Sequence, residues 1–596
     1  MAESISITDF KSLRGLRTKT HQDRRLAISS FKSIRALDTE TDRGGNVRII
    51  ADSDGSFLDK ITPENLIKWL FHKKYQNSWN FFYNLTFDAE VILKTLPQRV
   101  LDNYKKTRFL EFNFDGYKIE YLPSKKLAIR KGHHSAVFFD IAQYYHESLS
   151  NAYQNNIGKL PIEYLGMKSK RNVFSSYYFN HFPKQIREYC IQDCIYTREL
   201  AEHWIKLFYS AFQFYPARWI SSGYLAEKVL INQNIYIPRF FENSEEVQEF
   251  AYNSYFGGRF EILKRGLVGR AYIYDINSAY PFALTKIPDL TKGIWIKRRS
   301  IHPKALIGFF KIEADIPDVK QVPPFAFRKD SMVFFPSGKF VTFATLEELK
   351  ACENPKLYRI LDSVQYLLEN KRYPYKQFIE NLYLKRLELK QKNDPLQLPL
   401  KIILNSIYGK TGEITRGRIG NLFNPVIFST ITGHARAQLY RFVQDCNLER
   451  EVVAFATDSI CTTREIKVNS EELGDFSLDN TASDVFYLQN GFYRFNGKWK
   501  QRGFGRLRSR EIEHLDTIER EGKLLMKLKV LRPKRLRSSI LQDSVNEVGK
   551  FSEIERELNL NADKKRLWFE RIENIDSKTM NDSTPISLNY LNKNDI

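Results

Sequence analysis

Strand-like apolar runs in this chain end on acidic residues at several points. The first run, Ser33–Leu37, leads into Asp38-Thr39-Glu40, and after the turn residues 42–45 the run Val47–Ile50 predicts a second strand. Asp38 and Glu40 are two positions apart on extended chain, so their carboxylates face the same side. Two acids on one face are costly unless a cation neutralises them. By itself, however, an Asp-x-Glu pair is no evidence of a cation site, because this spacing recurs by chance in a chain of this length.

Further strands and a helix carry more acids. Trp79–Asn84 predicts a strand, with a helix opening at Leu85–Asp88, and Ala136–Asp140 predicts another strand. The run Ile186–Cys194 predicts a helix, on which Tyr189 and Asp193 lie four positions apart on one face. Taken alone, this pair is better interpreted as a surface Tyr–Asp contact.

Taken together, the acids of these segments fit a two-metal nuclease. They are Asp38, Glu40, Asp88 and Asp193. Two cations held by such a set can activate a water and stabilise the leaving oxygen, and Tyr189 can orient that water.

The middle of the chain predicts one strand and two long helices. The strand is Ala271–Asp275, and we expect Pro281 to end regular structure after it. The first helix is Tyr373–Lys392, residues 393–395 break it, and the second helix carries Lys401–Gly409.

Basic residues on these helices and an acid further on suggest phosphate chemistry. Arg386 and Lys390 share one helix face, and with Lys401 they could bring several cations onto a triphosphate. A solvated charged face is the alternative. The strand-like run Val452–Ile460 is broken at Asp458, which either holds a hard cation against a phosphate or lies in a simple turn.

Composition narrows the class of protein. The chain has 596 residues and a net charge of +22, which indicates several domains and favours a polyanion such as nucleic acid as partner. It has no apolar run long enough to span a membrane and no signal-peptide pattern. Its five cysteines are scattered, which argues for a reducing compartment and against a zinc site. We expect a cytoplasmic protein, in the host cell if it is viral.

The N-terminal acids lie in motifs that resemble the DnaQ-like proofreading domain of family B DNA polymerases. The segments Asp38-Thr39-Glu40, Asn84-Leu85-Thr86-Phe87-Asp88 and Tyr189-Cys190-Ile191-Gln192-Asp193 match the three exonuclease motifs at every fixed position. The resemblance implies metal ligation by Asp38, Glu40, Asp88 and Asp193. It also implies that Thr41, Asn84 and Phe87 hold the frayed 3′ end of DNA.

Four later segments resemble polymerase motifs of the same family, in the same order. They are Tyr255-Phe256-Gly257-Gly258, the linker that contacts DNA; Asp275-Ile276-Asn277-Ser278-Ala279-Tyr280-Pro281, motif A; Lys401 to Gly409, motif B matched in full; and Thr432-Gly433-His434-Ala435-Arg436, a template contact.

The resemblance assigns a role to each of these positions. Asp275 and Asp458 would bind two metal ions, and Tyr280 would lie under the incoming sugar and exclude a 2′-hydroxyl. Nucleotide binding would also use Arg386, Lys401, Asn405 and Tyr408, and DNA binding would use Tyr255, Gly257, Gly258, Ser278 and Arg436.

Five positions depart from the family pattern. Ala279 stands in the Leu place of motif A, and Ala435 stands in the Gly place of the template contact. Around Asp458 the family has Tyr-x-Asp-Thr-Asp-Ser, and Ala454 and Ala456 stand in the Tyr and first Asp places. Gly491 stands in the place of a lysine near the primer terminus. Lys498, Lys500 or Arg502 could supply that charge instead, and the sequence leaves the choice open.

The resemblance implies an α/β multidomain protein, with an RNase H-like 3′–5′ exonuclease followed by a right-hand polymerase. We expect two Mg²⁺ per active site, which Mn²⁺ can replace, with primer–template DNA and dNTPs as substrates. The compact protein-primed viral and plasmid branch is the nearest pattern, so a terminal protein primer is a further expected partner, and no membrane is expected.

We expect these segments: basic arm 1–30, exonuclease 31–210, linker 211–260, palm 261–370 and 413–505, fingers 371–412, thumb 506–575 and loose tail 576–596.

Several alternatives stay open. The polymerase could use nucleic-acid primers without a terminal protein. The chain could be a nuclease with an inactive polymerase half, or a basic nucleic-acid-binding protein with vestigial sites. The basic run Arg532-Pro533-Lys534-Arg535 fits a nuclear-import patch as well as a thumb that grips duplex phosphates. The interval from Gly409 to Thr432 is short, which predicts that a strand-displacement insertion is absent or minimal.

Overall fold

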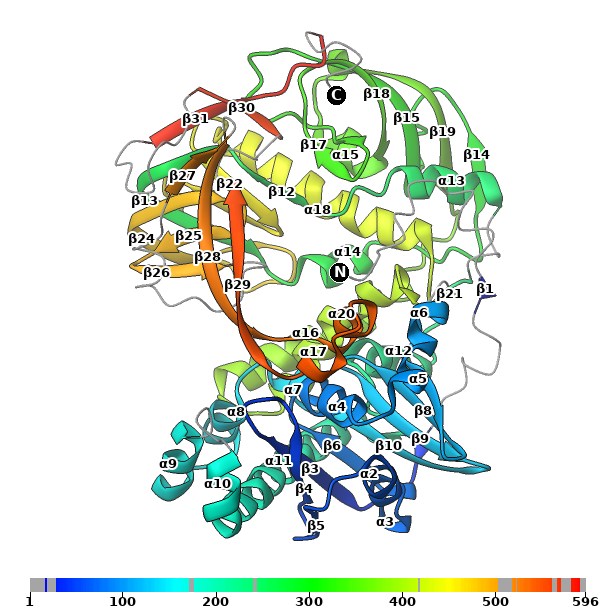
Figure 1. Ribbon diagram of the computed structural model, residues 1–596. Coiled ribbons are helices and arrows are strands. Elements are labelled where there is room, and N and C mark those ends of the chain that lie inside the picture. The colour runs from blue at the N-terminus through cyan, green and yellow to red at the C-terminus, as the bar shows by residue number, and fades with distance from the viewer. Residues whose placement is uncertain are drawn as a thin grey trace.

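The computed structural model describes residues 17–18, 28–170, 176–239, 244–415, 418–501, 517–520, 523–559, 565–569 and 580–589. Figure 1 shows a lower lobe built from the N-terminal part of the chain and an upper lobe built mostly from later residues. Helices α16 (Lys376–Gln391) and α17 (Gln397–Thr411) lie between the lobes. A long ribbon of β28 (Lys523–Pro533) and β29 (Phe551–Asn559) runs from the upper lobe to the lower one.

The lower lobe contains an eight-stranded sheet in the order β5-β4-β3-β6-β10-β9-β8-β7. The central strands β3, β6 and β10 are parallel, and the flanking strands pair antiparallel. The strands are β3 (Ile34–Thr41), β4 (Val47–Asp52), β5 (Phe57–Leu58), β6 (Trp79–Phe82), β7 (Glu111–Phe114), β8 (Tyr117–Leu122), β9 (Lys126–Lys131) and β10 (His134–Asp140).

Helices cover both faces of this sheet. On one face, Ile186 and Cys190 of α11 (Pro183–Phe212) share a core with Ile49 of β4. On the other face, α4 (Leu85–Lys94) packs with Ile50, the next residue of β4. The other helices here are α2 (Pro63–Leu70), α3 (Lys73–Gln76), α5 (Gln98–Leu101), α6 (Asn103–Thr107), α7 (Ala142–Tyr145), α8 (Leu149–Asn156), α9 (Ile162–Lys170) and α10 (Ser176–His181). This is the predicted RNase H-like arrangement.

The upper lobe contains a second, antiparallel sheet in the order β12-β22-β23-β13-β24-β25-β26, to which β30 and β31 are added. Helix α18 (Pro425–Asp445) packs on the face that carries Tyr272, Tyr274 and Ile460. The strands are β12 (Arg259–Ile262), β13 (Lys264–Ile276), β22 (Val452–Thr457), β23 (Ser459–Thr462), β24 (Phe476–Gln489), β25 (Phe492–Phe495), β26 (Lys498–Gln501), β30 (Arg566–Trp568) and β31 (Met580–Pro585).

A four-stranded sheet, β14-β19-β15-β18, fills most of the interval between Asp275 and Lys401. Its strands are β14 (Ile294–Lys297), β15 (Ile307–Ile316), β18 (Gly338–Thr345) and β19 (Tyr358–Leu367). The remaining elements are β1 (Arg17–Thr18), β2 (Ile28–Ser29), β11 (Tyr215–Pro216), α12 (Ser222–Asn232), α13 (Glu245–Asn253), α14 (Ala279–Thr285), β16 (Phe327–Lys329), β17 (Met332–Phe334), α15 (Leu346–Ala351), the 3-10 turns Pro355–Leu357 and Val545–Glu547, β20 (Ile414–Thr415), β21 (Arg418–Ile419), β27 (Thr517–Arg520) and α20 (Leu536–Leu541).

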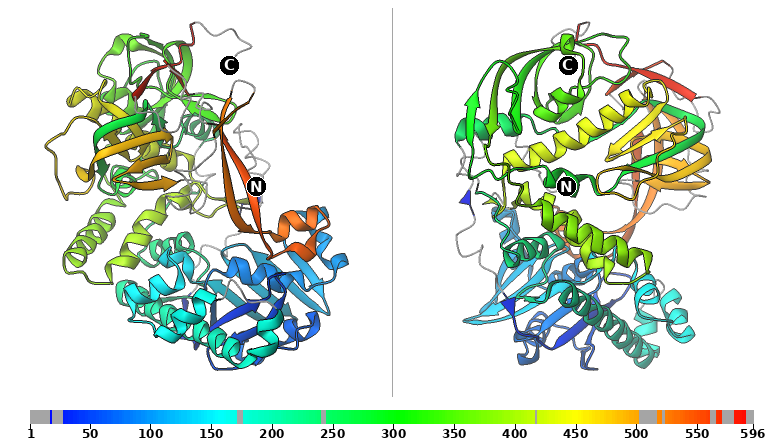
Figure 2. Two further views of the ribbon diagram at one scale, coloured as in Figure 1. Left: turned by 60° about the vertical axis from the view of Figure 1, so that its left-hand side comes forward. Right: turned by 180° about the vertical axis from the view of Figure 1, so that it is seen from behind.

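Helix α20, at the lower end of the β28–β29 ribbon, is part of the lower lobe (Figure 2). Its Leu536 and Ile540, with Val545 and Val548, belong to the same buried core as α4 and the first sheet. The Leu536 backbone N–H donates to Glu90 Oε2 on α4 at 3.2 Å. The lower end of the ribbon is therefore anchored in the core of the lower lobe.

The structure corrects two sequence expectations. Pro281 does not end regular structure, because it lies in the first turn of α14, where its missing N–H breaks no helical hydrogen bond. The expected loose tail contains β31, which pairs with β13 and places Asp582 at 2.9 Å from the Lys264 amine. Most of the expected basic arm, Arg502 and residues 506–516 lie outside the described residues. Among those described, no helix is long and apolar enough to cross a membrane.

Two candidate active sites

An acidic cluster lies between the first sheet and α11. Asp38 and Glu40 alternate on β3, and Asp193 comes from α11, with one carboxylate oxygen from each lying within 4.8 Å of the others. The Cys190 thiol of α11 donates to the Asp38 backbone carbonyl at 3.5 Å, which places this helix against β3. Three of the four predicted nuclease acids are thus brought together.

The fourth acid, Asp88, comes from α4 and is hydrogen-bonded to β3. Its Oδ1 accepts hydrogen bonds from the Thr39 backbone N–H at 3.1 Å and from the Thr39 hydroxyl at 2.6 Å. Burial raises the pKa of Asp88 to about 7. Burial, and then the charges of Asp88, Asp193 and Glu40, raise the pKa of Asp38 well above its usual range. Such crowded, buried acids favour a bound cation.

Tyrosines cover the Asp193 side of the cluster. The Tyr164 hydroxyl of α9 donates to Asp193 Oδ1, and the Tyr164 ring stacks on Tyr189 with centroids 5.5 Å apart. The Lys168 amine lies 3.2 Å from the Tyr164 oxygen. Sequence reasoning chose Tyr189 and missed Tyr164, because no motif spacing connects α9 to Asp193.

The residues predicted to hold the 3′ end of DNA follow the acids of this cluster on β3 or lie at the start of α4. Thr41 ends β3, Asn84 is exposed, and Phe87 is half-buried at the start of α4. Asn84 has a left-handed backbone with φ 65°, and its N–H donates to Asp140 Oδ1 at 3.0 Å. Asp140, which sequence reasoning did not select, therefore fixes the turn that presents Asn84 and Phe87.

A second acidic site lies at the ends of the central strands of the upper sheet. Asp275 is on β13, and Asp458 lies in the turn between β22 and β23, where its carbonyl accepts the Ile276 N–H at 3.0 Å. Burial, then the charges of Asp458 and Asp479, raise the pKa of Asp275 to about 7. Asp479 on β24 was also missed by sequence reasoning, because no family motif covers it.

The Tyr-x-Gly-Gly segment packs directly against this acidic turn. Thr457, just before Asp458, has φ 76°, which is unusual for a β-branched residue. A Cβ on Gly258 would lie 2.6 Å from the Thr457 methyl group, so only glycine fits there. Gly257 has φ 72° and its carbonyl accepts from Arg436. The segment therefore fixes the position of the turn.

Arg436 is buried, with 2% of its surface exposed. Its guanidinium donates to both carboxylate oxygens of Glu348, at 2.8 and 2.9 Å. These contacts support a role in holding the Gly257 loop, whereas its predicted contact with DNA stays a prediction.

The predicted nucleotide-binding residues lie on α14, α16 and α17. The Tyr280 ring of α14 stacks on Tyr408 of α17 with centroids 4.4 Å apart, and the Tyr255 hydroxyl lies 3.5 Å from that of Tyr408. Ser278 caps α14 with φ 52°. Lys401 and Asn405 are exposed on α17, and half-buried Arg386 lies on α16, where burial lowers its pKa. Lys498 and Lys500 are exposed on β26.

The family model for DNA polymerase type B, organellar and viral, matches residues 72–415, more than half of the chain. The chain belongs to this family. This type B chain is 27% identical over 425 residues to the DNA polymerase of Acidianus bottle-shaped virus (isolate Italy/Pozzuoli). That match covers 65% of this chain and 62% of the relative. This chain is 26% identical over 246 residues to a probable DNA polymerase of Ascobolus immersus, covering 39% and 19%. The matched region is thus under two thirds of the length of either relative.

Solved structures of phi29 DNA polymerase share the fold. The complex with primer–template DNA and incoming nucleotides has a TM-score of 0.63 at 14% identity, and the match covers 89% of this chain and 100% of that one. The orthorhombic crystal form has a TM-score of 0.57 at 15% identity, covering 79% and 90%. The predicted family and fold class are therefore confirmed.

Proposed function

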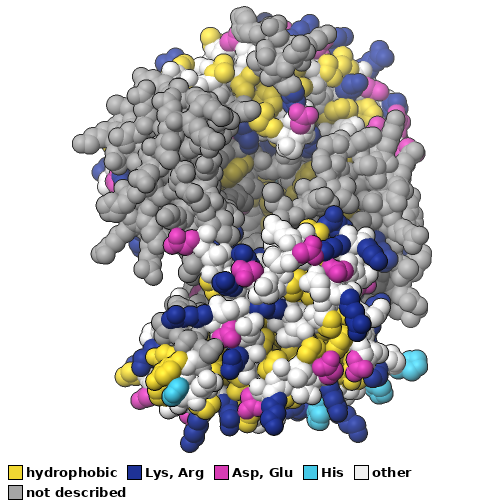
Figure 3. Space-filling model, in the orientation of Figure 1, with side chains coloured by type: hydrophobic (Ala, Val, Ile, Leu, Met, Phe, Trp, Pro, Cys, Tyr) yellow, Lys and Arg dark blue, Asp and Glu magenta, His cyan; other side chains and the backbone are white. Residues whose placement is uncertain are grey.

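We propose that this chain is a DNA-directed DNA polymerase with a 3′–5′ proofreading exonuclease. The observation that carries the polymerase assignment is the nearness of Asp275 to the Asp458 turn: the Asp458 carbonyl accepts the Ile276 N–H at 3.0 Å, and the Asp458 charge helps to raise the pKa of Asp275. The relative from a virus and the phi29 complex with primer–template DNA support the substrate class. The net charge of +22, with Lys and Arg side chains spread over the visible lower lobe (Figure 3), suits a polyanion.

The donor set of each site fits Mg²⁺. Asp275 and Asp458 in one site, and Asp38, Glu40 and Asp193 in the other, offer the hard oxygen ligands that Mg²⁺ prefers. When bound, Mg²⁺ lowers the pKa of the attacking hydroxyl or water and neutralises charge on the leaving group.

The chain's own residues position the polymerase substrates. Lys401 and Arg386 hold the triphosphate, and the Tyr280–Tyr408 stack forms the wall under the sugar that excludes a 2′-hydroxyl. The primer 3′-hydroxyl then attacks the α-phosphate in line, and pyrophosphate leaves. In the exonuclease, Asp88 fixes the Thr39 backbone between the two β3 ligands.

Two variants separate the activities. We expect Asp458→Ala to lose primer extension and keep 3′ degradation, and Asp38→Ala to do the reverse. The assay follows a 5′-labelled primer on a template with dNTPs and Mg²⁺ or Mn²⁺. A wild-type protein that degrades but never extends would favour the nuclease alternative, and one that does neither would favour a binding protein.

Protein priming is part of this proposal. The four-stranded sheet between Asp275 and Lys401 lies where the spacing leaves room for a branch-specific insertion, and it offers a surface that a priming protein could contact. The expected result is a covalent adduct between a dNMP and a co-encoded protein. Efficient extension of ordinary primers without any such adduct would favour the nucleic-acid-primed alternative.

A further inference from the structure

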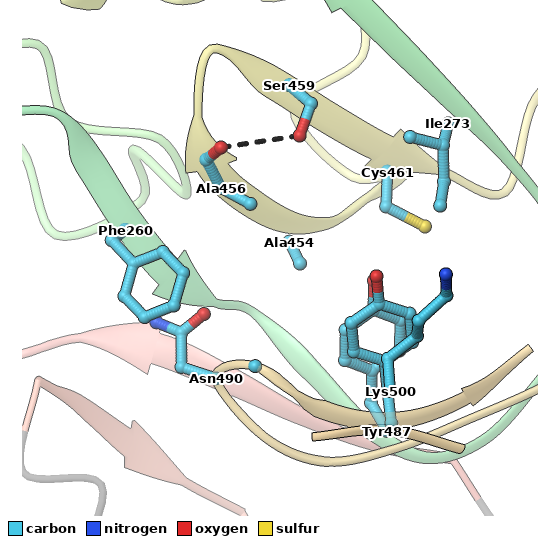
Figure 4. A pocket seen from close by; sticks show the side chains of 11 residues that line it. Phe260, Ile273, Ala454, Ala456, Ser459, Cys461, Tyr487, Asn490 and Lys500 are labelled. Atoms are coloured by element: carbon cyan, nitrogen blue, oxygen red, sulfur yellow. Dashed lines mark hydrogen bonds between the residues drawn. The ribbon is translucent and has the colours of Figure 1, made fainter. Parts of the chain in front are cut away.

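A pocket of about 300 Å³ opens on the lower lobe, at the β5 edge of the first sheet. Residues of β4 and the two residues that follow β5 line one side of it, and residues of α10 and of the first turns of α11 line the other. It is separate from the upper-lobe pocket beside the Asp458 turn (Figure 4), which is lined by Ala454, Ala456 and Gly491, three of the five departures from the family pattern. No described residue that lines the lower-lobe pocket has a predicted role in either active site.

The lower-lobe pocket lies close to the exonuclease acids. Its Ile49 is the cross-strand partner of Glu40, and α11 packs on the face of the sheet that carries Ile49. Its Ile186 lies on α11 seven residues before Asp193, which is two helix turns, or about 10 Å along the helix axis. The pocket is therefore about two helix turns from the place where 3′ degradation would release its product.

Three basic side chains and one acid line the pocket, which gives it a net positive charge. The basic residues are Arg48, Lys60 and Arg187, and the acid is Asp59. A guanidinium nitrogen of Arg187 lies 3.8 Å from Asp59 Oδ2, and one of Arg48 lies 3.6 Å from Asp42 Oδ2, both too far for a hydrogen bond. Within the part of the chain that the structure describes, the buried Arg187 Nε has no hydrogen-bond partner. An anion with several oxygens would supply the missing acceptors.

Apolar and aromatic side chains complete the lining. They are Ile49, Phe179, Pro183 and Ile186. The Arg48 guanidinium lies over the Phe179 ring, 5.5 Å from its centroid, and the Arg187 guanidinium lies over the Phe57 ring at 3.9 Å. Cation–π contacts of this kind hold the two guanidinium groups in place. The pocket therefore combines fixed cations with an apolar, partly aromatic wall, as a phosphate next to a base requires.

We propose that this pocket binds a nucleoside 5′-monophosphate, the product of 3′ degradation, with Arg48 and Arg187 on the phosphate and Phe179 against the base. The inference rests on the proposed exonuclease, because that activity would generate the ligand nearby. A volume of about 300 Å³ is at the small end of the range for ligand pockets, which suits one nucleotide. Arginine pairs bidentately with phosphate, and aromatic rings stack on bases. Capture in the pocket would draw the product away from the acids before the next 3′ nucleotide enters.

Binding of dAMP to the whole chain in the presence of EDTA tests the proposal, because EDTA removes binding that depends on metal ions at the two acidic sites. In isothermal titration calorimetry the wild type should bind one dAMP, and Arg187→Ala should bind it about tenfold more weakly, as expected for loss of one charge-assisted hydrogen bond. Arg198→Ala removes an arginine of similar exposure from the same helix, outside the pocket, and should bind like the wild type. Equal loss in both variants, or no binding by the wild type, would overturn the proposal.

Two smaller ligands test the separate contacts to phosphate and base. Inorganic phosphate and deoxyadenosine should each bind more weakly than dAMP, and Phe179→Ala should weaken binding of dAMP but not of phosphate. Phosphate that binds as tightly as dAMP would overturn the choice of a nucleotide as ligand. Circular dichroism checks the fold of each variant, and Arg48→Ala provides the same test as Arg187→Ala through the other guanidinium.

Failure of the proposed exonuclease would give a different result from failure of this pocket. A wild type that binds dAMP with the expected pattern but leaves primer 3′ ends intact would contradict the exonuclease. A wild type that degrades 3′ ends but does not bind dAMP would overturn the pocket assignment alone.

Discussion

At the residue scale, both sites hold carboxylates whose protonation is sensitive near neutral pH. Asp88 and Asp275 each have a pKa raised to about 7, in both cases chiefly by burial. Because a raised acid pKa means that the folded, metal-free protein binds a proton more tightly, the proton competes with a cation below that pH.

For Asp275 this competition predicts the pH dependence of polymerisation. At subsaturating Mg²⁺, the apparent metal affinity should fall by up to about tenfold per pH unit below about pH 7, as expected for one competing proton. Asp479→Asn removes one charge that raises the pKa of Asp275 and should move the midpoint to lower pH. Single-turnover primer extension between pH 6 and 8 measures this, and a flat profile would contradict it.

The Tyr164 hydroxyl is predicted to position Asp193 in the exonuclease. Tyr164→Phe removes a hydrogen bond to a charged acceptor and should slow 3′ degradation about tenfold or more, with primer extension unchanged. Tyr189→Phe is the matched comparison, because the two rings stack. If Tyr189→Phe slows degradation and Tyr164→Phe does not, the original assignment to Tyr189 stands.

The sequence motifs predicted the acids that are themselves motif residues. In the structure, Asp38, Glu40 and Asp193 of these motifs lie close together. The motifs could not predict partners contributed by other elements. Tyr164 and Asp479 reach the sites only through packing of α9 and β24, and no spacing in the sequence records that packing. The shared pocket of Ala454, Ala456 and Gly491 is hidden for the same reason.

At the element scale, the local pattern of apolar and turn residues predicted most strands and helices but not the bounds of each one. The pattern of α16 and α17, with a break at 393–395, follows from helix periodicity and turn residues. The strand β31 was missed, because its polar residues acquire their conformation by pairing with β13, a contact that sequence periodicity does not encode.

Close packing between elements makes Gly258 a sensitive position for polymerisation. Gly258→Ala would force its Cβ to within 2.6 Å of the Thr457 methyl group and displace the turn that carries Asp458. Overpacking of this kind costs about 1–3 kcal/mol, so extension should fall about tenfold while 3′ degradation persists. Gly158→Ala, where a Cβ meets open space, is the control. Normal extension by folded Gly258→Ala would contradict this account.

At the scale of the whole molecule, the core that α20 shares with α4 anchors the β28–β29 ribbon, which comes from the upper lobe, in the lower lobe. Leu536 is fully buried in that core, and its backbone N–H reaches Glu90 across 446 positions of sequence. The sequence motifs predicted that this segment belongs to a thumb. No local pattern in the sequence indicates a partner as distant as Glu90.

Removing that core side chain should destabilise the lower lobe, although the mutation lies near the other end of the chain. Leu536→Ala should cost about 2–5 kcal/mol of unfolding free energy, typical for a buried leucine. Hydrogen exchange should then show faster opening of β3 and α4. Leu541→Ala, at a leucine with 45% of its surface exposed, is the control. Exchange confined to α20 itself would show that the lobes are not coupled.

The docked α20 also has a consequence for biosynthesis. A ribosome releases the first sheet long before residues 536–548 exist, so the lower lobe emerges with part of its apolar interior open to water. Its folding can be completed only after residues 536–548 have been made. Nascent chains that stall in the upper lobe would therefore carry an incompletely folded lower lobe, with an exposed apolar surface of the kind that chaperones recognise.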